Sequence, residues 1–139
     1  MARSTLVMHV HKSIVYVEDE PEIRRTYERA MEKAGYRVYS ATTAQEAIDI
    51  LDTYDDIRCL VVDLFLPEHN GLAILHHIQS YADWQSIPVI ILSAKNRDEI
   101  QASDEYLADL GVVNYCDKTQ TEPKDLIRTL SEVIGGNQT

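Results

Sequence analysis

The chain has 139 residues, 45% of them hydrophobic, and a formal net charge of −10. That length is close to the commonest size of one domain and too short for two domains of ordinary size. The acidic excess argues against general binding to nucleic acid or to an anionic membrane. No segment approaches membrane-spanning length, and the first twelve residues lack the apolar stretch of a signal peptide. Cys59 and Cys116 lie in apolar segments without metal-type spacing, which favours free thiols and a cytoplasmic protein.

Predicted strands and helices alternate along the whole chain. The predicted strands cover residues 13–17, 37–41, 57–62, 89–92 and 112–115. Each is followed by a segment of helical spacing, and these segments cover about 21–34, 44–51, 71–80, 97–110 and 123–134. Pro21 and the pair Thr42–Thr43 mark helix starts, whereas Gly35 and Gly111 mark helix ends. Strict alternation predicts a single α/β domain, with a five-stranded parallel sheet and helices on both of its faces.

Ionisable residues follow three of these strands. Glu18 and Asp19 come after the first strand, Asp63 after the third and Lys118 after the fifth. Ligands of an open α/β sheet bind outside the carboxyl ends of its strands, so these side chains are expected to form one site. Three close carboxylates resist ionising together unless a cation compensates them. Their hard oxygen atoms suit Mg²⁺ with a phosphate group, and the pattern therefore predicts metal-assisted phosphoryl chemistry.

With the fourth strand included, the pattern resembles the receiver domain of two-component response regulators over residues 14 to about 134. The resemblance implies the doubly wound, flavodoxin-like (βα)5 fold with strand order 2-1-3-4-5. The motifs that carry it are the pair Glu18–Asp19, the spacing Asp63–x–x–x–Pro67–x–x–x–Gly71, the pair Ser93–Ala94, and Tyr115–x–x–Lys118. These four motifs occur in the family's order, at the ends of strands one, three, four and five.

The resemblance implies that Asp63 is the phosphoacceptor, a nucleophile that becomes an aspartyl phosphate. It implies that Mg²⁺ is the cofactor and that positioning and electrostatics supply the catalysis. The implied metal ligands are Asp19, Asp63, Glu18 directly or through water, and the backbone carbonyl of Phe65.

Three further roles follow from the same resemblance. Lys118 is expected to pair with Asp63 and afterwards with a phosphate oxygen. The Ser93 hydroxyl and the Ala94 backbone N–H are expected to donate to other phosphate oxygens. Ser93 and Tyr115 are expected to form the switch, in which Tyr115 turns inward when Ser93 moves toward the phosphate.

The domain limits and partners are expectations of the same kind. Residues 1–12 are interpreted as an N-terminal extension, 13–134 as the receiver domain and 135–139 as a flexible tail. The implied partners are a sensor histidine kinase or a histidine phosphotransfer protein, and then a downstream protein or a fused output domain. No direct contact with nucleic acid or membrane is expected. The domain is not expected to be an enzyme, since it catalyses only its own phosphorylation and dephosphorylation.

The sequence departs from the family pattern at two places. Thr119 follows Lys118, where the family usually has a proline after a cis bond, so the isomer of this bond stays open. The interval from Ser93 to Lys118 is also longer than usual by a few residues. In the family, that segment normally carries the output surface. Partner recognition is therefore the property that the resemblance predicts least well for this chain.

Other classes of protein fit less well. A haloacid-dehalogenase-type phosphatase needs a second aspartate where Phe65 stands. A flavodoxin-type cofactor carrier has a Ser-, Thr- and Gly-rich phosphate loop, whereas the turn here is the acidic EDEPE. A pseudo-receiver interaction module remains an alternative, although the complete motif set disfavours it. A DNA-binding regulator is disfavoured because no output domain follows the last predicted helix in this chain. The residues interpreted as surface or partner-facing are His9, His11, His69, His76, His77 and Trp84.

Overall fold

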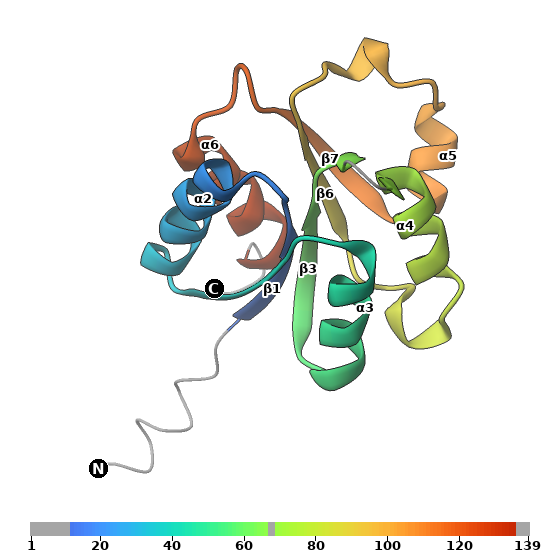
Figure 1. Cartoon of the computed structure of the whole chain (residues 1–139), viewed down its shortest axis with the longest axis horizontal. Coiled ribbons are helices and arrows are strands. Elements are labelled where there is room, and N and C mark those ends of the chain that lie inside the picture. Colours follow the sequence, from blue (N-terminus) through green and yellow to red (C-terminus); the bar gives the residue numbers. More distant parts are fainter. Residues whose placement is uncertain (1–11, 67–68, 136–139) are drawn as a thin grey trace.

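The computed structural model describes residues 12–66 and 69–135. Its centre is a five-stranded parallel sheet with helices on both faces (Figure 1). The strand order β2-β1-β3-β6-β7 is the predicted order 2-1-3-4-5, because β6 and β7 are the fourth and fifth strands of the sheet. The strands are β1 (Lys12–Val17), β2 (Tyr36–Ala41), β3 (Ile57–Val62), β6 (Val89–Ser93) and β7 (Val112–Asp117).

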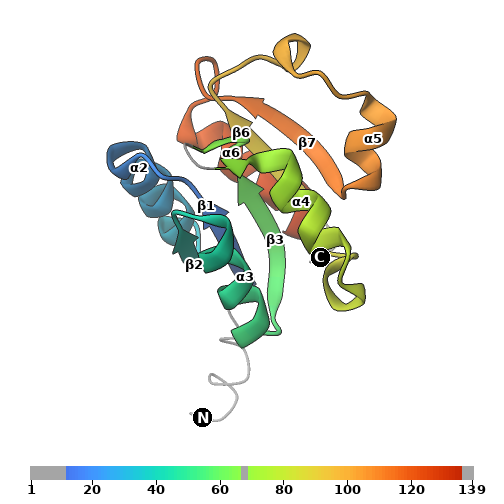
Figure 2. The same ribbon diagram turned by 45° about the vertical axis from the view of Figure 1, so that its right-hand side comes forward.

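Two layers of helices cover the sheet, and Figure 2 shows them from a second direction. The α-helices are α2 (Pro21–Lys33), α3 (Ala44–Thr53), α4 (Gly71–Gln79), α5 (Asp104–Asp109) and α6 (Pro123–Leu130). Shorter turns are η1 (Ala82–Trp84), η2 (Arg97–Glu99) and η3 (Ser131–Gly135). Within the described ranges, no helix combines the length and apolar character that crossing a bilayer requires.

The apolar core is divided by the sheet into two clusters. Along β1, Ile14 belongs to the cluster that contains residues of α2 and α6, whereas Val15 belongs to the cluster beneath α3, α4 and α5. Successive side chains of a strand point to opposite faces, so a strand with helices on both sides must be apolar at every position. This explains why the central strands appear in the sequence as unbroken apolar runs.

The predicted helix over residues 97–110 is wrong as a single element. The structure has η2, an extended residue at Ile100 (φ −90°, ψ 123°), and then the separate short helix α5. Asn96 caps η2 through a capping box with Glu99, and the Ser103 side chain accepts a hydrogen bond from the Tyr106 N–H at the start of α5. Two caps seven residues apart favour two short elements, because each satisfies the free N–H groups of a new helix start.

A small antiparallel pair follows β3 and was not predicted. It joins β4 (Phe65–Leu66) to β5 (His69–Asn70) and leads directly into α4. At the start of α4 the Gly71 N–H donates to the Leu64 carbonyl at 2.8 Å. A β-carbon on Gly71 would lie 2.4 Å from the Leu64 α-carbon, so only glycine fits this close approach. Gly71 therefore fixes the path of the chain just after Asp63.

Candidate functional site

The polar residues predicted at strand ends lie together at the carboxyl edge of the sheet. Backbone hydrogen bonds extend the strand pairing into this edge. The Asp63 N–H donates to the Val17 carbonyl at 3.1 Å, and the Lys118 N–H donates to the Ser93 carbonyl at 2.7 Å. The Glu18 N–H likewise donates to the neighbouring strand β2 at 3.0 Å. The hydrogen bonds of the sheet thus fix the backbone positions of these candidate site residues.

Lys118 bridges two carboxylates. Its Nζ lies 2.6 Å from Glu18 Oε1 and 2.8 Å from Asp63 Oδ2. The side chains of Glu18 and Lys118 are only 1% and 10% exposed, so solvent does little to screen these ion pairs. The pairing of Lys118 with Asp63 matches the implied contact. The slightly shorter contact with Glu18 was missed, because nothing in a sequence distinguishes a metal ligand from a lysine partner at that position.

Glu18 is further held by its own turn. Its Oε2 accepts the Glu20 N–H at 3.2 Å, and its backbone carbonyl accepts from Arg24 at 3.2 Å. By contrast, Asp19 is half-buried and its carboxylate has neither a hydrogen bond nor an ion pair within the part of the chain that the structure describes. Asp19 is therefore the carboxylate of this group that is most available to an added cation.

The ionisation of this cluster reflects two carboxylates that share one ammonium group. Burial raises the pKa of the Glu18 carboxyl above its ordinary value, and the contacts with Lys118 offset this only in part. Burial opposes the charged form of Lys118, but its hydrogen bonds and charge attraction to Asp63 and Glu18 together outweigh burial, so its pKa is raised. Lys118 is therefore charged at neutral pH and is insufficient to neutralise the carboxylates around it.

Glu18, Asp19 and Asp63 fit a divalent cation. One carboxylate oxygen from each lies within 4.8 Å of those of the other two. When all three are ionised, Lys118 leaves the cluster with two uncompensated negative charges, which a divalent ion would neutralise. Carboxylate oxygens are the ligands that Mg²⁺ prefers. The backbone of Phe65 begins β4, two residues after Asp63, while its side chain lies outside the described part of the chain.

Ser93 and Tyr115 flank the loop that leaves β6. The Ser93 hydroxyl is fully buried and accepts the Lys95 N–H at 3.2 Å. The half-buried Tyr115 donates its hydroxyl to the Lys95 carbonyl at 2.6 Å, and burial raises the pKa of its phenol. Ala94, which lies between Ser93 and Lys95 in the sequence, is exposed. Tyr115 is thus bonded to the backbone of the segment that must move if Ser93 is to move.

The remaining predicted features have mixed outcomes. The Lys118–Thr119 peptide bond is trans, which settles the open question of its isomer in this structure. Cys59 and Cys116 are free and buried, as expected. Trp84 was interpreted as surface or partner-facing; it is half-buried, packs against the core and lines a pocket. Pro67, His9 and His11 lie outside the described residues.

The sequence profile of the response regulator receiver domain matches residues 14–131. The chain belongs to this family. It is therefore a receiver domain of the kind found in two-component signalling, and the match runs from within β1 to the end of α6 and includes every predicted site residue. The fold and family expected from the sequence are confirmed.

Curated relatives of this receiver domain include two longer regulators. The KDP operon transcriptional regulatory protein KdpE of Escherichia coli is 33% identical over 103 residues, which cover 69% of this chain and 44% of KdpE. The response regulator SaeR of Staphylococcus aureus is 29% identical over 121 residues, which cover 87% of this chain and 50% of SaeR. The chain thus spans about half the length of these relatives.

Solved structures share the fold. The chemotaxis protein CheY4 of Vibrio cholerae is 19% identical with a TM-score of 0.79, covering 90% of this chain and 100% of CheY4. A sensor protein from a Polaromonas species is 21% identical with a TM-score of 0.80, covering 91% of this chain and 98% of that protein. At these identities the likeness establishes the fold alone.

Proposed function

We propose that this receiver domain accepts a phosphoryl group on Asp63 from a histidine kinase or a histidine phosphotransfer protein, in a Mg²⁺-dependent reaction. The observation that carries the proposal is the buried ammonium of Lys118, bound to both Glu18 and Asp63 beside the Asp19 carboxylate, which has no partner among the described residues. A structural ion pair needs one carboxylate for one ammonium. Three ionised carboxylates beside one ammonium group leave two negative charges uncompensated, and a divalent cation would neutralise them.

The reaction consists of one bond formed and one bond broken. A carboxylate oxygen of Asp63 attacks phosphorus, and the bond from phosphorus to the donor imidazole nitrogen breaks. The nitrogen keeps the bonding electron pair, and Asp63 becomes an acyl phosphate. Glu18, Asp19, Asp63 and the Phe65 carbonyl would hold Mg²⁺, which when bound neutralises charge on the transferring group.

Lys118 has a second partner, and this shapes its role in the reaction. Because its Nζ is bound to Glu18 as well as Asp63, it remains anchored when Asp63 turns toward phosphorus. The ammonium then pairs with a phosphate oxygen, where a compact charge with three donors is effective. In this account Glu18 positions Lys118 and would also contribute to the Mg²⁺ site.

Ser93, Ala94 and Tyr115 would transmit the change. The Ser93 hydroxyl and the Ala94 N–H donate to the phosphate oxygens. That movement breaks the contact between Ser93 and the Lys95 N–H and releases the Lys95 carbonyl from Tyr115. Tyr115 then turns inward, so the surface around β7 changes when Asp63 is phosphorylated.

We assign the receiver domain to residues 12–135, from the start of β1 to the end of η3, with the residues before it as an extension and those after it as a tail. Its output is contact with a downstream protein or with a fused output domain, and it catalyses no reaction besides its own phosphorylation and dephosphorylation. The free, buried thiols of Cys59 and Cys116 support a cytoplasmic location.

The direct test is labelling with radioactive acetyl phosphate. Wild-type protein is expected to take up label with Mg²⁺ and none with EDTA, and Asp63→Asn none under either condition. Asp109→Asn, an exposed aspartate at the end of α5, serves as the matched control and should label like wild type. Wild-type labelling of the Asp63→Asn variant would refute the assignment.

A further inference from the structure

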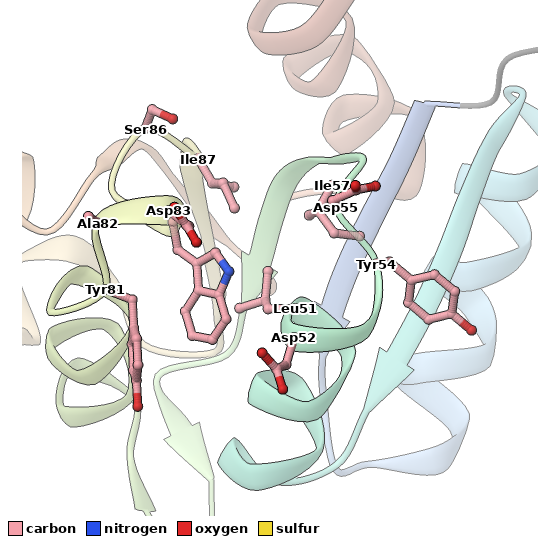
Figure 3. Close-up of a pocket in the computed structure, with 11 residues that line it drawn as sticks. Leu51, Asp52, Tyr54, Asp55, Ile57, Tyr81, Ala82, Asp83, Ser86 and Ile87 are labelled. Carbon is pink, nitrogen blue, oxygen red and sulfur yellow. The ribbon is translucent and has the colours of Figure 1, made fainter.

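A pocket lies at the opposite end of the sheet from Asp63. It has a volume of about 500 Å³, within the range of about 300–1,000 Å³ that is typical of binding pockets. Figure 3 shows Leu51 and Asp52 on one side of it, with Tyr81, Asp83 and Ile87 across from them. Ile57, the first residue of β3, also lines it. The pocket therefore lies at the amino ends of strands, away from the phosphoacceptor candidate.

The pocket is acidic and lacks internal compensation. Its lining contains Asp52, Asp55 and Asp83, all exposed, and no lysine, arginine or histidine. None of the three forms an ion pair with any residue that the structure describes. The last turn of α3, which leads into the pocket, has no basic residue either. The carboxyl end of this helix adds negative potential, because it carries a partial negative charge.

Apolar and aromatic groups form the rest of the lining. Leu51 is buried, while Ile87 and Trp84 are half-buried and pack against the core. Tyr81 lies against Trp84, with ring centroids 4.6 Å apart. Tyr81 is 45% exposed. Tyr54 is 40% exposed, but its ring stacks on Tyr39 with centroids 4.1 Å apart, so it contributes less to the pocket. Aromatic faces beside carboxylates form an environment that attracts a cation with an apolar stem.

We propose that this pocket docks a basic segment of a partner protein by accepting an arginine side chain. The methylene stem of the arginine contacts Leu51 and Ile87, and the guanidinium lies over Trp84 within reach of Asp52 and Asp83. Arginine is the better fit than lysine because its planar group stacks on an aromatic ring while still donating to carboxylates. The inference does not depend on phosphorylation of Asp63.

Other occupants fit less well. Three aspartates repel a phosphate or an acidic peptide. A bare metal ion is disfavoured because, among the described residues, the carboxylates close enough to share one ion are Glu18, Asp19 and Asp63 and not these aspartates. A wholly apolar helix would leave the three aspartates desolvated and unpaired, which is unfavourable. Charge complementarity therefore favours a basic partner.

The chain contains one tryptophan, Trp84, so its fluorescence reports on this pocket alone. We suggest titrating unphosphorylated protein with an acetylated and amidated nonapeptide in which arginine alternates with leucine. The control peptide carries citrulline, which is uncharged but nearly the same shape, in place of arginine. A saturable change in Trp84 emission is expected with the arginine peptide, and it should weaken as salt rises from 50 to 500 mM.

Variants locate the binding. Asp52→Asn/Asp83→Asn is expected to weaken the arginine peptide by about 10-fold, since two exposed charge pairs together contribute on the order of 1–2 kcal/mol. Asp98→Asn, an exposed aspartate in η2, should bind like wild type. Equal binding of the citrulline peptide, no saturable change, or an unaffected double variant would each overturn the proposal. Labelling of the double variant by acetyl phosphate should be unchanged, which separates this inference from the proposal about Asp63.

Discussion

The two ends of the same parallel sheet both gather acidic side chains, but in opposite physical states. At the carboxyl end Glu18 and Asp63 are buried and bound to Lys118. At the amino end Asp52 and Asp83 are exposed and have no ion-pair partner among the described residues. Residue type alone therefore does not define a site. Burial and pairing determine whether a carboxylate belongs to internal chemistry or to an outer surface.

The difference follows from the cost of desolvation. A buried carboxylate without a cation is strongly disfavoured, so Lys118 is required at one end. Exposed carboxylates are stabilised by water and need no partner, so the other end tolerates three aspartates at little cost. The free energy of unfolding is therefore expected to change strongly when a charge in the buried cluster is removed. It is expected to change little when an exposed aspartate is neutralised, and the effect of such a change should appear only in the binding of a cationic partner.

The largest expected effect on stability is that of Lys118→Met. This change leaves Glu18 and Asp63 without their ammonium group, and breaking a buried pair in this way costs about 3 kcal/mol. Urea unfolding in EDTA measures the loss, and Mg²⁺ should restore part of it by supplying a replacement charge. Adding Asp63→Asn to the variant should also recover stability. Lys124→Met, whose side chain is 74% exposed, should change the unfolding free energy by less than about 0.5 kcal/mol. Equal stability of the two lysine variants would contradict the contrast.

A smaller effect is expected from Gly71→Ala. The new β-carbon would lie 2.4 Å from the Leu64 α-carbon, so the chain just after Asp63 must shift. Forcing an extra methyl group into packed surroundings costs about 1–3 kcal/mol. Because alanine is otherwise the better helix former, a loss of stability reports the clash and not helix propensity. Acetyl phosphate labelling should slow in parallel, whereas unchanged stability and labelling would show that the close approach has no role.

The smallest effect is expected from Asp52→Asn/Asp83→Asn without any partner. Removing two solvated, unpaired charges should alter the free energy of unfolding by no more than about 0.5 kcal/mol, and relief of repulsion favours a slight gain. Urea unfolding at low salt is the suitable measurement. A loss above about 1.5 kcal/mol would mean that these aspartates support the fold, and the contrast between the two ends would fail.

The sequence predicted one end of the sheet far better than the other. Glu18, Asp63 and Ser93 each follow an apolar run, and parallel topology brings the carboxyl ends of strands together, so their meeting could be foreseen. The pocket at the amino end joins Leu51 and Asp52 to Asp83 and Ile87, more than thirty positions later, and no local pattern marks that meeting. Trp84 was therefore expected to be surface or partner-facing, but its place in this pocket could not be predicted.

The other two errors arose because the sequence allows more than one local arrangement. Helical spacing over residues 97–110 concealed two capping residues, Asn96 and Ser103, which divide the segment into η2 and α5. The ion pair between Lys118 and Glu18 was missed because a lysine can pair with any carboxylate at the same edge of the sheet, and the sequence does not specify which one. The sequence thus predicts which elements meet more reliably than which atoms bond.

The most direct test of the account is to identify the residue that becomes phosphorylated. Protein treated with acetyl phosphate and Mg²⁺ is reduced with borohydride, which converts an aspartyl phosphate to homoserine, and is then digested for mass spectrometry. The account predicts homoserine at position 63 and at no other aspartate, with none formed when EDTA replaces Mg²⁺. Homoserine at Asp19 or at the exposed Asp52 or Asp83, or modification that is independent of Mg²⁺, would contradict it.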